Sequence, residues 1–121
     1  MPMDRGIADY ALDGRTHVIE VTGQVDINAA PVLQERTTRV IDEGKKRVIV
    51  DLSRVVFMDS TGLGVLVGAL KRLRAGQGVL ALVVTDYDVE RLLELTGLDR
   101  TFTIYRSRDE AVESLTLTHG D

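Results

Sequence analysis

A serine followed by small residues, at the predicted start of a helix, is the feature of this sequence that could do chemistry. The segment DSTGLG, residues 59–64, leads into a helix predicted to end near Ala75. A serine at the N-cap position accepts hydrogen bonds from the free N–H groups of the first helical turn. We interpret Ser60 as this N-cap, and its flanking residues Asp59, Thr61 and Gly62 leave little bulk between the hydroxyl and a docking protein.

A covalent phosphate on Ser60 is the chemistry that this position favours. The positive end of a helix dipole and several N–H donors stabilise an anion, so the fold could hold the modified serine without rearranging. The phosphate would add about −1.5 to −2 charges beside Asp59. A protein docked over this segment would lose affinity through steric clash and through the cost of removing water from the new charge.

Three glycines, Gly62, Gly64 and Gly68, fall within the first turns of the same predicted helix. Each glycine in a helix interior costs roughly 1 kcal/mol relative to alanine, so the three together cost on the order of 2–3 kcal/mol. One interpretation is close packing against a sheet, which the shared face of Gly64 and Gly68 fits. The other is a surface kept small around Ser60 for a docking partner. The sequence leaves both interpretations open.

Other chemistries of Ser60 are less well supported. Hydrolysis would need a base within hydrogen-bond reach, and the two histidines are His17, predicted on a strand at the sheet edge, and His119, in the C-terminal tail. With two histidines and no cysteine, a transition-metal site is not expected. The glycine spacing matches neither the phosphate loop nor the dinucleotide fingerprint, although weak nucleotide binding at the helix start remains open.

Acidic and basic residues allow further alternatives. Asp26, Asp51 and Asp59 could gather around a divalent cation; alternatively Asp51 caps the end of a strand and the other two are solvated loop acids. The basic residues are either a solvated surface, which we favour, or a contact for an acidic partner. They form two short runs: Lys45, Lys46 and Arg47, then Lys71, Arg72 and Arg74.

Alternating strands and helices are predicted to position these residues. Apolar periodicity, turn signals at Asp13-Gly14 and a capping-box spacing at Ser107 and Glu110 set the boundaries. We expect Asn28 to cap the first helix and Gly44 to end it. The order β-β-α-β-α-β-α-β-α predicts an α/β fold with a mixed, mostly parallel sheet. The predicted strands are residues 7–12, 16–25, 47–52, 79–84 and 102–105, and the helices are residues 29–43, 61–75, 87–96 and 108–117.

Composition limits the remaining functions. The chain has 121 residues and 13.3 kDa, which suits one domain, with a core expected over residues 6–117 and mobile ends. A net charge of −4, with three tyrosines, two phenylalanines and no tryptophan, argues against binding nucleic acid or anionic membranes. Without cysteine, signal peptide or an apolar run longer than residues 79–84, the sequence predicts a cytoplasmic protein.

Residues 55–75, VVFMDSTGLGVLVGALKRLRA, resemble the signature of bacterial anti-sigma factor antagonists of the STAS domain family, especially the stress-response and developmental antagonists. The segments GQVDINAAPVL (residues 23–33) and LLELTGLDRTF (residues 92–102) extend the resemblance over nearly the whole chain. The resemblance implies the STAS fold, with four or five strands and about four helices packed against the sheet.

The same resemblance implies a function in transcription regulation. Ser60 would be phosphorylated by an anti-sigma factor that is itself an ATP-dependent serine kinase. Asp26 would lie beside Ser60, and the partner-binding surface would comprise Asp26, Asp59, Thr61, Gly62, Leu63 and Gly64. The unmodified protein would capture the anti-sigma factor and free a sigma factor, phosphorylation would end the capture, and a metal-dependent serine phosphatase would restore it.

On this interpretation the protein is a binding module without cofactor or enzymatic activity, and it works as a monomer when free. Two other classes remain open. The first is an accessory STAS subunit of a lipid or anion transport complex, in which phosphorylation is irrelevant. The second is a nucleotide-binding protein.

Overall fold

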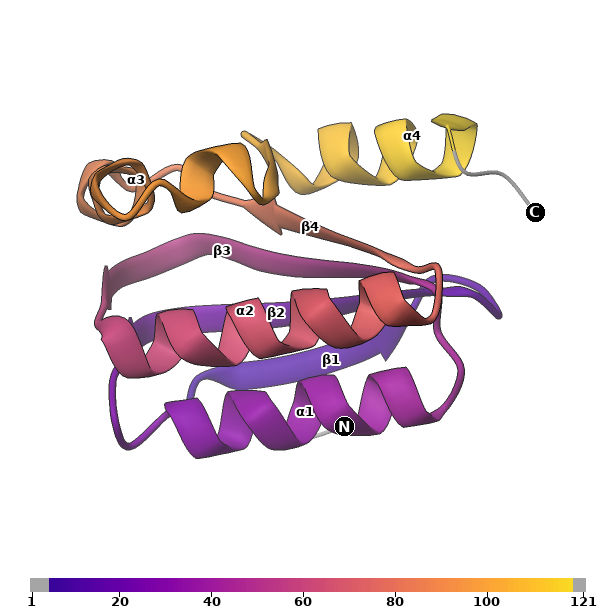
Figure 1. Ribbon diagram of the computed structural model, residues 1–121, viewed down its shortest axis with the longest axis horizontal. Helices are drawn as coiled ribbons and strands as arrows, with labels where there is room; N and C mark the ends of the chain where they lie inside the picture. The colour runs from indigo at the N-terminus through magenta and orange to yellow at the C-terminus, as the bar shows by residue number, and fades with distance from the viewer. Residues whose placement is uncertain (1–4, 119–121) are drawn as a thin grey trace.

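Five strands form one mixed sheet in this computed structural model, which describes residues 5–118 (Figure 1). The predicted order of elements is confirmed, with one added 3-10 helix, Leu98–Arg100. The strands are β1 (Ile7–Ala11), β2 (Thr16–Val25), β3 (Arg47–Met58), β4 (Val79–Val83) and β5 (Thr103–Tyr105), and the α-helices are α1 (Ala30–Asp42), α2 (Ser60–Ala75), α3 (Tyr87–Leu95) and α4 (Arg108–Thr118).

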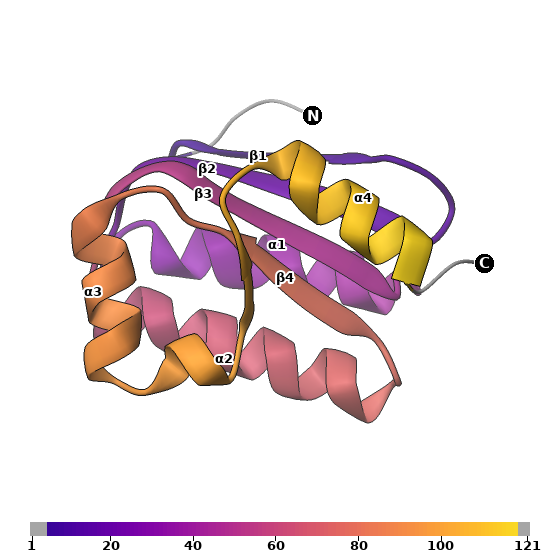
Figure 2. The ribbon, with the colours of Figure 1, turned by 90° about the horizontal axis from the view of Figure 1, so that it is seen from above.

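The strands lie in the sheet in their sequence order, β1-β2-β3-β4-β5. β1 and β2 form an antiparallel hairpin, whereas β2 to β5 are parallel to their neighbours. Helices α1 and α2 cover one face of the sheet, and α4 returns across the other face (Figures 1 and 2). Because α1, α2 and α3 each follow one of the parallel strands, all three begin where these strands end, on the left in Figure 1. We call this end of the sheet the helix-start edge, and it differs from the lateral edge that β1 forms.

Two apolar clusters hold these layers together. The larger one lies between the sheet and α1 to α3, and includes Leu33, Leu66 and Leu93, each at most 1% exposed. The smaller one joins β2, β3 and β4 to Ala111 and Leu115 of α4. The central strand β3 is therefore covered on both faces over its first half, as its unbroken apolar run predicts.

β3 extends six residues beyond its predicted end at Leu52. It pairs with β4 over Arg47–Asp51, but with β2 as far as Met58. Two register shifts against β2 each place an extra residue in β3, and such bulges break the alternation of inward and outward side chains. As a result, the consecutive residues Val56 and Phe57 are both exposed, at 58% and 47%.

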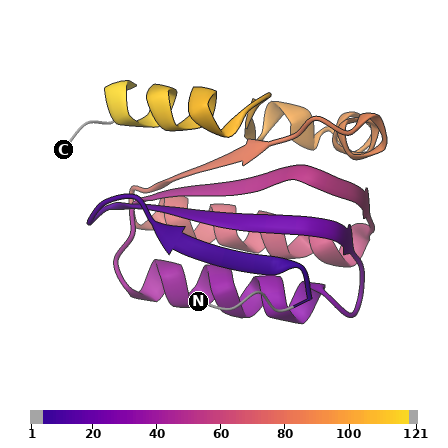
Figure 3. The ribbon, with the colours of Figure 1, turned by 180° about the vertical axis from the view of Figure 1, so that it is seen from behind.

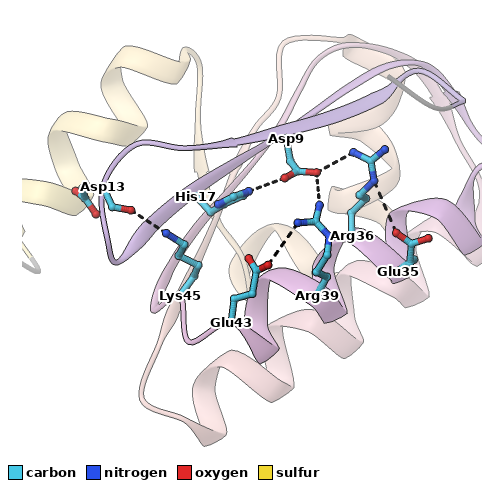
Figure 4. Close-up of polar contacts among 8 residues, drawn as sticks. All are labelled: Asp9, Asp13, His17, Glu35, Arg36, Arg39, Glu43 and Lys45. Carbon is cyan, nitrogen blue, oxygen red and sulfur yellow. Dashed lines mark hydrogen bonds and ion pairs between the residues drawn. The ribbon is translucent and has the colours of Figure 1, made fainter. Parts of the chain in front are cut away.

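A buried ionic cluster ties the edge strand β1 to α1 (Figure 4). The Asp9 carboxylate contacts His17 Nε2 at 2.7 Å, Arg36 Nη1 at 2.8 Å and Arg39 Nη2 at 2.6 Å. Burial raises the pKa of Asp9, but the hydrogen bonds from His17, Arg39 and Arg36 outweigh burial and leave that pKa lowered. The predicted edge position of His17 is wrong, because β1 and not β2 forms the edge of the sheet (Figure 3). His17 is buried on β2, on the face of the sheet that α1 covers (Figure 4).

A second ionic cluster attaches α4 to the opposite face. Glu20 and Asp51 are direct neighbours across β2 and β3, and Arg108 bonds to both of them and to the Tyr10 hydroxyl. Burial raises the pKa of Asp51, but hydrogen bonds from Ser53 and Arg108 leave it lowered. Asp51 is therefore a buried partner of Arg108 within β3, not the predicted strand-end cap.

The remaining surface follows the predictions with one exception. Lys46, Lys71, Arg72 and Arg74 are exposed and Lys45 is half-buried, whereas Arg47 is buried and donates to Thr16 Oγ1 at 2.7 Å. Over residues 5–118, no helix has the length and apolar character needed to cross a membrane. His119 and most of the predicted mobile ends lie outside the described residues.

Candidate functional site at the start of α2

Ser60 is the first residue of α2, and the predicted N-cap assignment is wrong by one position. The N-cap is Asp59, whose Oδ1 accepts hydrogen bonds from Thr61 N at 3.0 Å and Gly62 N at 3.2 Å. Among residues 5–118, the exposed Ser60 side chain has no hydrogen-bond partner. The hydroxyl is thus not consumed by capping, and remains available to a protein that approaches this end of the helix.

Aspartate carboxylates also bind backbone N–H groups just before α1 and at the N-cap of α3. Asp26 Oδ1 accepts from the backbone N–H groups of Asn28 and Ala29, at 2.9 and 3.2 Å. The predicted cap at Asn28 is therefore wrong, because Asp26 bonds to the N–H groups that precede α1. Asp86 caps α3 through the backbone of Asp88 and Val89. An aspartate thus precedes each of the three helices at the helix-start edge.

Asp26 and Ser60 belong to adjacent loops. Val25 and Met58 are cross-strand partners, and Asp59 N donates to Val25 O at 3.2 Å. These contacts join the end of β2 to the end of β3, immediately before Asp26 and Ser60 respectively. The expected proximity of the two residues is therefore consistent with the backbone arrangement.

The alternative chemistries find no support at the helix-start edge. No cluster of three His, Asp or Glu side chains suited to a metal ion occurs within residues 5–118; Asp51 is instead bound by Arg108. His17 lies at the beginning of β2, eight residues before Val25, which is about 26 Å at 3.3 Å per residue. It is also bonded to Asp9, so it cannot act as a base for Ser60.

The three glycines of α2 have different surroundings. A Cβ atom on Gly62 would lie 2.6 Å from Val25 Cγ1 and 3.0 Å from Val25 O. A Cβ atom on Gly64 or Gly68 would meet nothing within 4 Å. The packing interpretation is therefore correct for Gly62 and wrong for Gly64 and Gly68. The two open glycines line a groove between α1 and α2, together with Gln34, Thr61, Val65 and Arg72.

The predicted partner-binding residues divide by exposure. Thr61 and Gly64 are exposed, and Asp26 and Asp59 are half-buried. Gly62 and Leu63 are buried, with Leu63 only 6% exposed. These two residues face the core, so they position the helix start and do not present a surface to a partner.

Exposed apolar residues at the helix-start edge were missed by the sequence analysis. Ile27 and Tyr87 are 70% and 71% exposed, and Val56 and Phe57 lie on the bulged part of β3. Single apolar residues beside aspartates give no periodic signal, and the bulges are invisible without the register of β2. Only the folded arrangement brings these residues to the edge that carries Ser60.

Comparisons with known proteins agree with this arrangement. The sequence pattern of the STAS domain family matches residues 9–111. The anti-sigma-B factor antagonist of Staphylococcus aureus strain NCTC 8325 is 38% identical over 80 residues, which are 66% of this chain and 74% of that protein.

Solved structures show the same architecture. An anti-sigma factor antagonist from Mycobacterium paratuberculosis superposes with a TM-score of 0.81 at 30% identity, covering 89% of this chain and 91% of that one. Bacillus SpoIIAA in its phosphorylated form superposes with a TM-score of 0.73 over 90% of this chain and 98% of that one. At 23% identity, the second likeness shows the fold alone. The fold expected from the sequence is confirmed.

Proposed function

This chain belongs to the STAS domain family, and we propose that it is an anti-sigma factor antagonist controlled by phosphorylation of Ser60. The unmodified protein binds an anti-sigma factor that is also a serine kinase, and a sigma factor is released. Phosphorylation of Ser60 ends this binding, and a serine phosphatase restores it. Similarity to the antagonists of Staphylococcus aureus and Mycobacterium paratuberculosis supports the binding role.

The observation that carries the proposal is the free hydroxyl of Ser60. Asp59 satisfies the N–H groups of Thr61 and Gly62, so Ser60 can accept a phosphoryl group without loss of the helix cap. Its oxygen would attack the γ-phosphorus of ATP in the kinase site, the hydroxyl proton would pass to a base of the kinase, and ADP would leave. This chain supplies the acceptor atom only.

The position of Asp59 also explains how a phosphate would act. Two N–H groups of the first turn already bond to the Asp59 carboxylate, so they cannot neutralise a phosphate unless Asp59 is displaced. A phosphate dianion therefore stays in water beside a carboxylate. A docked protein would have to remove that water, which is costly for an ion without a paired charge. The phosphorylated Bacillus SpoIIAA supports the narrower point that this fold can carry a phosphate.

Phosphorylation with the purified anti-sigma factors of the same genome tests this function. After incubation with ATP, mass spectrometry should find one phosphate, on Ser60, in the wild type and in Thr61→Ala. Ser60→Ala should remain unmodified and keep its binding to the kinase, whereas Ser60→Asp should bind more weakly. A phosphate on Thr61, no phosphate with any of these kinases, or equal binding by the modified and unmodified protein would refute the proposal.

A further inference from the structure

Four large apolar side chains are exposed in the segments at the end of the sheet where α2 begins. They are Ile27 after β2, Val56 and Phe57 at the end of β3, and Tyr87 at the start of α3, with exposed fractions of 70%, 58%, 47% and 71%. We call them the apolar edge patch. Large apolar side chains gathered at one end of a domain are typical of a protein interaction site.

Backbone contacts bring the members of the patch to one edge. Phe57 is the cross-strand partner of Gln24, and Val25 pairs with Met58. Ile27 is two residues after Val25, so it follows the end of β2 that lies next to Phe57. Thr85 Oγ1 donates to Ser53 O at 2.9 Å, which holds the segment before Tyr87 against β3. The patch therefore spans the ends of three neighbouring strands.

We propose that the apolar edge patch supplies most of the affinity for the anti-sigma factor, and that it meets a partner face that is apolar at its centre and carries Lys or Arg at its rim. The inference rests on the function proposed above, and it adds residues and a partner chemistry to that site. It separates the residues that hold the partner from Ser60, which decides whether the partner can stay.

The size of a protein interface supports this assignment. A partner that transfers a phosphoryl group to Ser60 must bring its active site into contact with that residue. A standard interface covers about 800 Å² on each protein, which is a disc of roughly 16 Å radius. Phe57 precedes Ser60 by three residues and Val56 by four, which limits their separation to about 11 and 14 Å along an extended chain. Both residues therefore fall within the footprint of a partner centred on Ser60.

Charge around the patch defines the rim of the partner. Asp26, Asp59, Asp86 and Asp88 lie in the segments that flank the patch. One basic residue, Arg54, is exposed nearby on β3. Basic side chains on the partner would complement this acidic rim and accelerate association at low ionic strength.

The same arrangement gives a reason why a phosphate on Ser60 would prevent binding. A phosphate three residues from Phe57 would face the apolar centre of the partner, where no opposite charge offsets the free-energy cost of desolvating a dianion. Aromatic side chains that are buried at the centre of an interface usually dominate affinity. Phe57 and Tyr87 are therefore expected to carry the largest share, and their loss should weaken binding without any phosphate.

Calorimetry with unphosphorylated variants tests the patch. We would measure the Kd of Phe57→Ser, Tyr87→Ser and Ile27→Ser for the ADP-loaded anti-sigma factor that phosphorylates the wild type. Each variant should bind at least about 10-fold more weakly, and in phosphorylation assays KM should rise while kcat stays near the wild-type value. Leu12→Ser is the matched control, because Leu12 is 42% exposed at the opposite end of β2, and it should bind as the wild type does.

The outcomes separate the patch from the proposed function. If Ser60 is phosphorylated but the three patch variants bind as tightly as the wild type, the patch is refuted and the function stands. If the wild type binds no anti-sigma factor of its genome, both are refuted. Ile27 lies in a loop and Tyr87 is 71% exposed, so these variants should keep the wild-type Tm and remain informative even if Phe57→Ser does not fold. A rate of association that does not fall with added salt would contradict the basic rim.

Discussion

Replacing Gly64 with alanine should stabilise the domain and weaken its complex with the anti-sigma factor. A methyl group at Gly64 meets no atom within 4 Å, so the folded state accepts it without strain. Alanine is favoured over glycine in a helix interior by about 0.8–1.0 kcal/mol. The free energy of unfolding should therefore rise by nearly 1 kcal/mol, which corresponds to an increase in Tm of about 4 °C for a domain of this size.

Gly62→Ala should have the opposite effect on stability. Its methyl group would lie 2.6 Å from Val25 Cγ1 and 3.2 Å from Met58 Cγ, and Val25 is completely buried. Overpacking of this kind costs about 1–3 kcal/mol, which exceeds the gain in helix propensity. We expect a net loss of about 1 kcal/mol.

Urea unfolding followed by circular dichroism measures both stabilities, and calorimetry measures the binding of each variant. Gly68→Ala is the matched control, because it has the same open surroundings but lies one helical turn further from Ser60. It should gain as much stability as Gly64→Ala and lose less affinity. A destabilised Gly64→Ala, or a stabilised Gly62→Ala, would refute this account of the glycines.

Three further predictions concern the charged residues. Asp59→Ala removes the cap of α2 and should cost about 1 kcal/mol in urea unfolding, whereas Asp59→Asn should recover most of it; equal losses would contradict the capping role. Asp9→Asn removes the buried carboxylate that contacts Arg36, Arg39 and His17 and should cost about 3 kcal/mol at pH 7. Because the pKa of Asp9 is lowered by folding, its contribution is complete above the unfolded value of about 3.9 and disappears as the pH falls through the folded value. The gap between wild type and Asp9→Asn should therefore shrink below about pH 4 in acid titrations, and a constant gap would refute the linkage. Arg108→Met leaves Asp51 buried beside Glu20 and should cost about 2 kcal/mol. NMR should find a higher pKa for Asp51 in this variant than in the wild type, and an unchanged pKa would show that Arg108 does not lower it.

The order of elements could be predicted from the sequence because it depends on local signals. The alternation in residues 16–25 and the apolar run after Arg47 identify their strands, and Gly44, with φ +89°, ends α1 as expected. The length of β3 could not be predicted, since its second half pairs only with β2 through two bulges. Bulges arise from the pairing of distant segments and leave no period in one strand.

The partners in the buried ion pairs could not be predicted for the same reason. Asp9 and Arg36 are 27 residues apart, and Asp51 and Arg108 are 57 apart. Nothing in the residues next to Asp51 distinguishes a buried ion pair from a polar strand end. The exposure of Gly64 and Gly68 was equally open, because periodicity places residues on a shared face but does not say what that face meets.

The error at Ser60 is the most informative one, because serine and aspartate are both good N-cap residues and stand side by side in this chain. A serine at the cap would have its oxygen occupied by backbone N–H groups, and a kinase would have to compete with the helix for it. With Asp59 at the cap, the capping hydrogen bonds do not involve the Ser60 side chain. Under the proposed function, these separate roles of Asp59 and Ser60 would let phosphorylation change the surface that a partner meets without removing the helix cap. Exchanging the pair, with Asp59→Ser and Ser60→Asp, would therefore move the hydroxyl into the cap, and we expect this double variant to be a poor kinase substrate even though the pair still contains a serine.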